Sequence, residues 1–435
     1  MTARKEFNRL TAAEAAAAIA GGELKATDLM ASCLDRVADR EPFVHAFQRL
    51  DADAARAAAE RADSSQPKGP LHGVPFVAKD IIDTADFPTG WGSPVHAERR
   101  PGRDASCIQL LKDAGAILVG KSVTTEFACF HPGPTANPRN LAHTPGGSSS
   151  GSAAAVADFM VPFALGTQTS GSLVRPGAFC GVLAYKPTHG DFDLDGVMGV
   201  AASLDTLGGF ARSVDDLMLL RRALCPNLGG AHTVSGWRPR IALMRGPHWA
   251  EGSMEMRDVC QRALAALADA GAAVGELSTP EIFLDLSARQ KIIMTYETAR
   301  ARIFEYRRHR DRISAAFAEI VEAGLATSHD DYASALDAAD RARRVHDAQF
   351  LEFDVILSPA AAGEAPKGLH ATGDPLYSRG WTLLHAPLVS VPAGIGPNGL
   401  PLSVQLVGRR NADDVLLQAA RWIAPRLDPG LPEPD

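Results

Sequence analysis

The sequence predicts an α/β fold: a single large domain in which helices cover both faces of a mixed β-sheet. Short apolar runs bounded by turn residues alternate with longer helical stretches along most of the 435 residues, as in helix-covered sheets that are largely parallel or mixed. A hydrophobic content of 46% is ample for one large core. The residues that indicate chemistry lie in one stretch, 79–176, and 388–408 completes the sheet, which argues for one domain rather than two.

The N-terminal segment, residues 1–64, is expected to consist of helices, because alanine dominates much of it and favours helix. Thr11 followed by Glu14 three positions later is the pattern of a capping box, which predicts a helix start. Thr27 is expected to cap a second helix that runs to about Ala38. This segment is therefore expected to add helices, and no strands, to the fold.

The core is expected to span 65–240, and its sheet to be completed by the C-terminal part, 354–424. Short apolar runs between turn residues predict the strands. The expected strands are Val74–Lys79, Ala116–Gly120, Met160–Leu165, Gly181–Lys186, Arg240–Met244, Val355–Ser358, Leu388–Pro392 and Ser403–Gly408. The helices expected in the gaps include Val214–Leu224, Met256–Ala270 and Asp413–Ile423.

Residues 285–350 differ in character from the rest, since they are charged and have apolar residues at roughly helical spacing. These apolar residues are Ile293, Phe304, Ile313, Phe317 and Ile320. We expect an insertion of helices that lies over the sheet. The tail, 425–435, is rich in proline and acidic residues and is expected to fray.

Composition excludes several classes of function. The formal net charge is −7 and no basic block occurs, which argues against nucleic-acid binding. No run of 18 apolar residues predicts a membrane span, and the first residues do not resemble a signal peptide. The 6 cysteines are scattered without a Cys-x-x-Cys pair, which favours reduced thiols in a cytoplasmic protein over disulfides or a zinc site. We expect no metal and no cofactor.

Two Gly/Ser-rich turns are the most informative feature of the chain. The first is Gly146–Ser152 and the second is Gly166–Ser172, and each is followed by an apolar stretch of small residues, at 153–157 and 173–176. Tight glycine turns at helix starts direct backbone N–H groups and serine hydroxyls at one point. An enzyme that stabilises an anionic intermediate needs such an arrangement.

A lysine ends a third segment, Leu71–Asp80, in which Lys79 closes a short apolar strand. Lysine is uncommon at such a position, because burying its charge is costly. Burial lowers the pKa of a lysine, and a neutral amine acts as a base. Two serine turns and one buried lysine therefore make a candidate Ser/Lys hydrolase.

These three motifs, in this order, resemble the amidase signature family. Lys79 and Ser148 are 69 positions apart, and Ser148 and Ser172 are 24 positions apart, as the family's spacing requires. The resemblance covers about 70–219 and 354–422. It implies the amidase signature fold, hydrolysis of an amide C–N bond without a cofactor, and a variable 285–350 segment that shapes the substrate pocket.

The resemblance also implies roles for individual residues. Ser172 is the expected nucleophile, and Ser148, preceded by a cis peptide bond, is expected to bridge it to Lys79. Neutral Lys79 takes the proton through Ser148 and later returns one to the leaving amine, with an acyl-enzyme between the two steps. The backbone N–H groups of Thr169, Ser170, Gly171 and Ser172 are the expected oxyanion hole.

The surroundings of the nucleophile depart from the common family pattern. Arg175 lies three residues after Ser172 rather than two, and Gln168 stands where aspartate is commoner. Both traits resemble the malonamidase-like branch, in which this arginine reaches the carboxylate of a small acidic amide, a group that guanidinium binds bidentately. The alternative is an arginine held in a structural ion pair with a loop acid. Ser170 replaces a glycine, which narrows the pocket.

The wall of the substrate site is expected to include Gly147 and His131, the latter on a loop before Pro132. A Ser-His-Asp triad would need a histidine near the nucleophile, and no spacing supports one. The remaining candidates, His72, His143 and His385, are expected to be core or surface residues.

Two functions remain open from the sequence. The first is a stand-alone amidase that cleaves a small-molecule amide to a carboxylate and ammonia or an amine, with amides that bear a carboxylate as one candidate class. The alternative is a glutaminase-type subunit of a tRNA-dependent amidotransferase complex, which would deliver ammonia to a partner. The Gln168 and Arg175 traits and the short chain argue for the first. Homodimer formation is left open.

Overall fold

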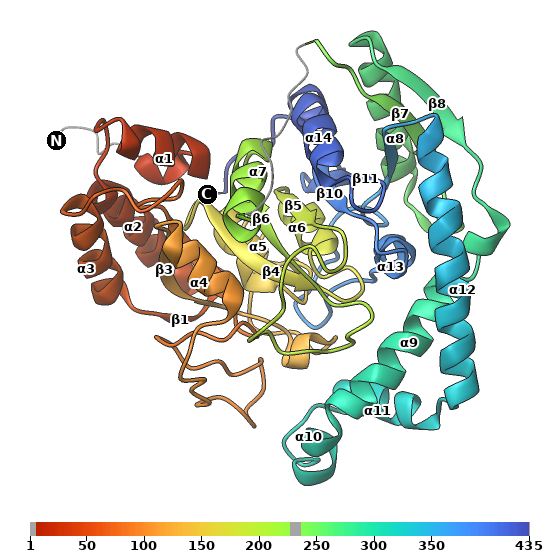
Figure 1. Ribbon diagram of the computed structural model, residues 1–435, viewed down its shortest axis with the longest axis horizontal. Helices are drawn as coiled ribbons and strands as arrows, with labels where there is room; N and C mark the ends of the chain where they lie inside the picture. The colour runs from red at the N-terminus through yellow and green to blue at the C-terminus, as the bar shows by residue number, and fades with distance from the viewer. Residues whose placement is uncertain (1–5, 227–235, 435) are drawn as a thin grey trace.

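The computed structural model describes residues 6–226 and 236–434, which form one mixed sheet with helices on both faces (Figure 1). The expected α/β fold is thereby confirmed. Within the described ranges the sheet has 11 strands. Their order across the sheet is β1 (Phe47–Leu50), β3 (Ile117–Ser122), β2 (Pro75–Lys79), β4 (Phe163–Gln168), β6 (Thr206–Ala211), β5 (Leu183–Lys186), β10 (Leu388–Ile395), β11 (Pro401–Val407), β9 (Val355–Pro359), β7 (Arg240–Met244) and β8 (Ala273–Leu277).

The sheet is mixed because two parallel groups flank an antiparallel centre. Strands β3, β2 and β4 are parallel, and so are β9, β7 and β8. Between them, β6, β5, β10 and β11 each pair antiparallel with both neighbours.

The helices are α1 (Ala12–Ala20), α2 (Ala26–Val44), α3 (Ala52–Asp63), α4 (Ser106–Asp113), α5 (Ser150–Ala157), α6 (Val174–Cys180), α7 (Val214–Leu224), α8 (Met254–Asp269), α9 (Leu286–Ala301), α10 (Ile303–Arg308), α11 (Ala315–Ala326), α12 (His329–Ala348), α13 (Leu376–Leu383) and α14 (Asp413–Leu427).

Strand β2 shows how the two faces are covered, because successive side chains point to opposite faces. Phe76 and Ala78 join the apolar cluster that includes α4, α7 and α14. Val77 joins the cluster of α2, α3 and α5 on the other face. Lys79 follows on the face of Val77, toward the start of α5, which is where the first serine turn lies.

The N-terminal expectations hold in part. Thr11 and Glu14 form the capping box. Thr27 is not a cap: α2 starts after Lys25, the Asp63 carboxylate accepts from the N–H groups of Ala26 and Thr27, and the helix continues to Val44 instead of Ala38. The segment also contains a strand, β1, that the sequence did not predict. It is a short edge strand whose residues alternate between half-buried and exposed, so no apolar run marks it.

Two further strands, β6 and β8, were missed, and β4 begins at Phe163 rather than Met160. Strand β6 carries Gly208 and Gly209 at its centre, a composition that argues against a strand. A Cβ at Gly208 would lie 2.1 Å from the Tyr185 carbonyl oxygen, so the neighbouring strand requires glycine there. Strand β8 is a partly exposed edge strand.

The expected helices of 285–350 are present as α9 to α12. In Figure 1 they extend beside the sheet at the right, where α9 packs against α11, α12 and α13. Ile293, Ile313 and Phe317 are buried, but Phe304 is 56% exposed. Ile293 lies in an apolar cluster with Met244 of β7 and Ile356 of β9 as well as with residues of α13, so the segment packs against both the sheet and α13.

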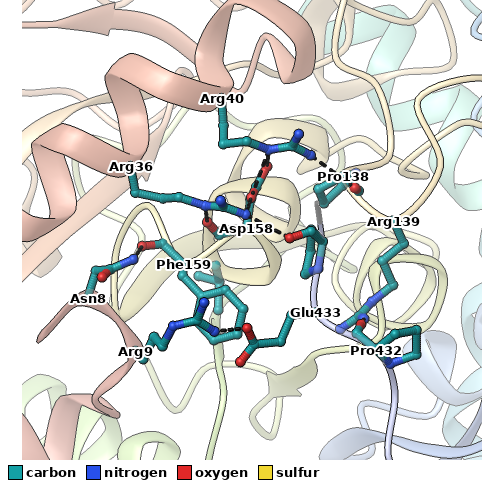
Figure 2. Close-up of polar contacts among 12 residues, drawn as sticks. Asn8, Arg9, Arg36, Arg40, Pro138, Arg139, Asp158, Phe159, Pro432 and Glu433 are labelled. Atoms are coloured by element: carbon teal, nitrogen blue, oxygen red, sulfur yellow. Dashed lines mark hydrogen bonds and ion pairs between the residues drawn. The ribbon is translucent and has the colours of Figure 1, made fainter. Parts of the chain in front are cut away.

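The C-terminal tail is not frayed, because three arginines hold it (Figure 2). Helix α14 runs past Pro425 to Leu427. Beyond it, Arg139 Nη1 donates to the Pro432 carbonyl at 2.6 Å, Arg36 Nη2 donates to the Pro434 carbonyl at 3.0 Å, and Arg9 forms an ion pair with Glu433. The proline-rich composition did not reveal these partners, which come from three separate segments.

Within the described ranges, none of the helices combines the length and the apolar character needed to cross a bilayer. All 6 cysteines are free thiols, and all but Cys225 are buried.

Candidate active site

Lys79 lies at the end of β2 and is fully buried. Its Nζ donates to Ser148 Oγ at 2.7 Å and to Thr167 Oγ1 at 2.8 Å. The structure therefore brings the lysine motif and the first serine turn together. Burial lowers the pKa of Lys79 from 10.5 to about 7, because the apolar surroundings disfavour the ammonium; the charge of nearby Asp205 opposes the shift.

The first serine turn leads into α5 and contains the cis peptide bond, between Gly147 and Ser148, that was expected. Three of its serines have hydrogen bonds that account for them structurally. Ser149 Oγ donates to the Thr167 carbonyl, Ser150 Oγ to the Gly146 carbonyl, and Ser152 Oγ to the Leu165 carbonyl. Ser148 is thus the serine of this turn whose hydroxyl faces a titratable group.

Ser172 lies in the loop between β4 and α6 and is buried, with 7% of the residue exposed. Within the described part of the chain its hydroxyl makes no hydrogen bond, to Ser148 or to any other group. The N–H groups of Thr169, Ser170, Gly171 and Ser172 likewise have no partner among the described residues. This loop therefore presents a hydroxyl and four consecutive unpaired donors, the groups that an oxyanion site would need.

Gln168 determines how this loop meets the following helix. Its Oε1 accepts from the N–H groups of Leu173 and Val174, at 2.9 and 3.1 Å, at the start of α6. Its Nε2 donates to Thr382 Oγ1 of α13 at 2.9 Å. The neutral amide thus performs two tasks at once, accepting from a helix start and donating to a second helix, whereas an ionised aspartate can only accept.

Asp205 carries a buried carboxylate beside the site. This residue was not predicted from the sequence. It accepts from Thr169 Oγ1 at 2.5 Å and from the N–H groups of Val200 and Ala201 at 2.7 and 3.0 Å. Burial raises the pKa of Asp205 to about 6, although these three donors oppose the shift. The carboxylate both fixes Thr169 and adds a charge near Lys79.

Arg175 is buried in the first turn of α6 and points at backbone. Its Nη2 donates to the Gly147 carbonyl at 2.6 Å and to Thr372 Oγ1 at 3.1 Å, and its Nη1 donates to the Gly373 carbonyl at 2.8 Å. Its Nε is buried without a partner. Among the described residues no carboxylate lies in ion-pair range of Arg175, so the expected alternative, a pair with a loop acid, is not what holds it.

Gly147 and His131 differ in their relation to the site. Gly147 packs against Thr125 and Thr372, where a Cβ would lie 2.8 Å from the Thr372 methyl carbon. His131 is exposed and lines a surface groove with Glu126 and Ser314. Of the other candidate histidines, His72 contacts the Ala62 carbonyl and His385 contacts the Ser203 carbonyl and Arg343, whereas Nδ1 of His143 is buried without a partner among the described residues.

Sequence reasoning missed four residues that contact the motifs: Thr167, Asp205, Gln290 and Thr382. Thr167 lies inside the second Gly/Ser turn and could have been named for its position beside Gln168. The other three come from segments with no local signal, and only the fold brings them to the loop. Within the described ranges, no group of three or more His, Cys, Asp or Glu side chains is arranged to hold a metal ion.

Comparison with known proteins gives consistent results. The family model described as Amidase matches residues 28–417. A glutamyl-tRNA(Gln) amidotransferase subunit from Acidothermus cellulolyticus is 34% identical, over 94% of this chain and 92% of the relative. The corresponding subunit from Anaeromyxobacter sp. is 32% identical, over 100% and 99%. The solved structure of a peptide amidase from Stenotrophomonas maltophilia is 27% identical, with a TM-score of 0.84, over 98% of each chain.

Proposed function

This chain belongs to the amidase family, whose members act on amide C–N bonds, and we propose that it hydrolyses the C–N bond of a small-molecule amide through Lys79, Ser148 and Ser172. The observation that carries the proposal is the contact of 2.7 Å between Lys79 Nζ and Ser148 Oγ. A lysine whose pKa lies near 7 is neutral for a large part of the time at neutral pH, and a neutral amine is the base that a serine nucleophile needs.

The reaction proceeds in two halves. Ser172 Oγ attacks the amide carbon while its proton passes through Ser148 to Lys79. The carbonyl oxygen becomes an oxyanion, which the N–H groups of residues 170–172 stabilise. The C–N bond then breaks as Lys79 returns the proton to the nitrogen, releasing ammonia or an amine and leaving an acyl ester on Ser172. Water, deprotonated by the same route, attacks the ester carbon. The bond to Ser172 Oγ then breaks as Lys79 returns the proton to that oxygen, which regenerates Ser172 and releases the acid as a carboxylate.

A relay from Ser172 to Ser148 requires the two hydroxyls to approach when substrate binds. Their hydrogen bond is absent between the described side chains, and hydrogen bonds of catalytic groups are often long before substrate is present. The nucleophile is also nearly buried, so the acyl group that reaches it must be small or extended.

Two members of this reaction class remain as candidates. Curated relatives of 30–34% identity are named as subunits of glutamyl-tRNA(Gln) amidotransferase, which supports a glutaminase-type subunit more strongly than a stand-alone enzyme. The stand-alone candidate is supported by the residues around the nucleophile, namely Gln168, Ser170 and the shifted Arg175.

An acidic amide, as in the malonamidase-like branch, is the substrate class that Arg175 favours if its unpaired Nε–H meets a carboxylate. The other donors of Arg175 already hold three backbone and side-chain oxygens near Gly147. These hydrogen bonds support a structural role for Arg175, which is the alternative to its role in binding the substrate carboxylate.

Ammonia release by the purified chain tests these proposals. The panel includes glutamine, asparagine, neutral aliphatic amides and amides that bear a carboxylate, without ATP or another protein. Release from a small amide at a useful rate supports the stand-alone enzyme, and release from glutamine only when a partner protein is added supports the amidotransferase role. Ser172→Ala is the negative control. The matched control is Ser150→Ala, which alters a serine whose hydroxyl bonds only to the Gly146 carbonyl. Unchanged activity of Ser172→Ala would refute the mechanism.

A cytoplasmic location is proposed on the 6 free thiols. Recovery of the tagged chain outside the cytoplasm would contradict it.

A further inference from the structure

Three consecutive peptide groups of the loop at Ser172 have their carbonyl oxygens fixed, each by a different element. The Thr169 carbonyl accepts from Gln290 Nε2 of α9 at 2.9 Å. The Ser170 carbonyl accepts from Thr382 Oγ1 of α13 at 2.7 Å. The Gly171 carbonyl accepts from the N–H of Arg175 at 2.9 Å, within the first turn of α6.

These three contacts determine the direction of three N–H groups. A peptide group is planar, and in the trans form the C=O of one residue and the N–H of the next point in opposite directions. The peptide groups between residues 169 and 172 are trans. Fixing the carbonyls of Thr169, Ser170 and Gly171 therefore aims the N–H groups of Ser170, Gly171 and Ser172, three of the four donors of this loop that have no partner in the described part of the chain.

Gln290 is suited to this task because it is fully buried and its amide is constrained. Nε2 also donates to Ser170 Oγ at 2.8 Å, so one amide group holds both the backbone and the side chain of the loop. Its Oε1 is buried without a partner. A buried oxygen without a partner costs stability, so the two hydrogen bonds of Nε2 are what Gln290 contributes to the loop.

Thr382 is oriented in the same way. Gln168 Nε2 donates to its hydroxyl oxygen at 2.9 Å, so the hydroxyl hydrogen is directed to an acceptor. The two acceptors within reach are the Ser170 carbonyl at 2.7 Å and the Ser378 carbonyl at 2.9 Å. The hydroxyl has one hydrogen to donate. When it goes to the nearer acceptor, the Ser170 carbonyl, Gln168 and Thr382 form a short chain of hydrogen bonds that ends on the loop.

We propose that Gln290 and Thr382 are positioning residues that aim the oxyanion-hole N–H groups of Ser170 and Gly171. The inference rests on the proposed function of the Ser172 loop. It assigns to α9, in the helical segment 285–350, an effect on the rate of the chemical step in addition to any effect on which substrate enters.

The test uses a fluorophosphonate, in which Ser172 Oγ attacks phosphorus, fluoride leaves, and the phosphoryl oxygen occupies the oxyanion site. Intact-protein mass spectrometry follows the adduct over time at several probe concentrations, which separates the maximal labelling rate from probe binding. The variants are Gln290→Met, which keeps the length of the side chain, and Thr382→Val, which keeps its shape. Thr298→Val is the matched control, because Thr298 is a buried threonine bonded only to its own helix.

We expect Gln290→Met and Thr382→Val to slow the maximal labelling rate by about 10- to 100-fold, somewhat less than loss of an oxyanion donor outright. Half-saturation by the probe should change by no more than about threefold, since the donors act on the transition state rather than on binding. Thr382→Ser, which keeps the hydroxyl, should restore most of the rate, and Thr298→Val should label like the wild type.

Each outcome bears on one proposal. Labelling of Gln290→Met and Thr382→Val at the wild-type rate overturns the positioning role, and so does a Thr382→Ser variant as slow as Thr382→Val. Absence of an adduct on Ser172 in the wild type overturns the proposed function and this inference with it. Should Gln290→Met fail to fold, as a lowered melting temperature would reveal, the pair Thr382→Val and Thr382→Ser decides alone.

Discussion

Replacing Lys79 by methionine should abolish amide hydrolysis and, at neutral pH, stabilise the fold. Folding buries Lys79 and lowers its pKa from 10.5 to about 7. Between these two values the unfolded chain holds a proton that the folded chain has released. The folded state therefore loses about 1.4 kcal/mol for each pH unit below 10.5, or about 4 kcal/mol at pH 7.5.

The two hydrogen bonds of Lys79, to Ser148 and Thr167, offset part of that cost. At about 1 kcal/mol each, they leave a net gain of about 2 kcal/mol in the free energy of unfolding for Lys79→Met at pH 7.5. The free energy of unfolding of the wild type rises with pH between about 7 and 10.5, because in this range the unfolded chain binds a proton that the folded chain does not. The advantage of Lys79→Met should therefore shrink through this window and reverse near pH 9.

Equilibrium urea unfolding of both proteins between pH 6.5 and 10 measures the difference, in which the titration of groups that do not interact with Lys79 cancels. Lys68→Met, at an exposed lysine, should stay within about 0.5 kcal/mol of the wild type. In the same pH range, kcat/KM of the wild type should rise about tenfold per pH unit below about pH 7 and then level off. A pH-independent difference in stability, or a Lys79→Met variant less stable at pH 7.5, would refute a neutral buried lysine.

Three further predictions concern the same site. Ser172→Ala should lower ammonia release by about 10³-fold or more while leaving the melting temperature unchanged, because only the attacking oxygen is lost; residual activity near the wild-type level would exclude Ser172 as the nucleophile. Asp205→Asn should move the acidic limb of the pH–rate profile to lower pH, since the carboxylate charge favours protonated Lys79; a shift to higher pH would contradict this. Arg175→Lys should reduce kcat/KM for acidic amides by about tenfold or more and for neutral amides much less, whereas equal losses with a lower melting temperature would identify Arg175 as a brace.

The sequence by itself located the motifs because each of them is local. A glycine–serine turn before a small-residue helix, and a lysine at the end of an apolar strand, are visible within about ten residues. Lys79, Ser148 and Ser172 could therefore be named without the fold. The strands with a continuous apolar run, such as β2 and β9, were also predicted, because burial on both faces leaves a direct compositional trace.

Segments of regular structure that carry no continuous apolar run were not predicted from the sequence. Strand β6 has glycines at its centre because a neighbouring strand approaches closely, and edge strands β1 and β8 are partly exposed. The tail beyond α14 looked unstructured because the arginines that hold it belong to distant segments.

Only the tertiary structure decided which groups meet around the two serine turns. The contact of Lys79 with Ser148 and Thr167, the carboxylate of Asp205, and the hold of Gln290 and Thr382 on the loop all join residues that no sequence period relates. A hydrogen bond between residues more than a hundred positions apart, such as that from Gln290 to Thr169, leaves no pattern in the chain. It exists because the sheet fixes where β4 ends and helix packing fixes where α9 and α13 lie against it.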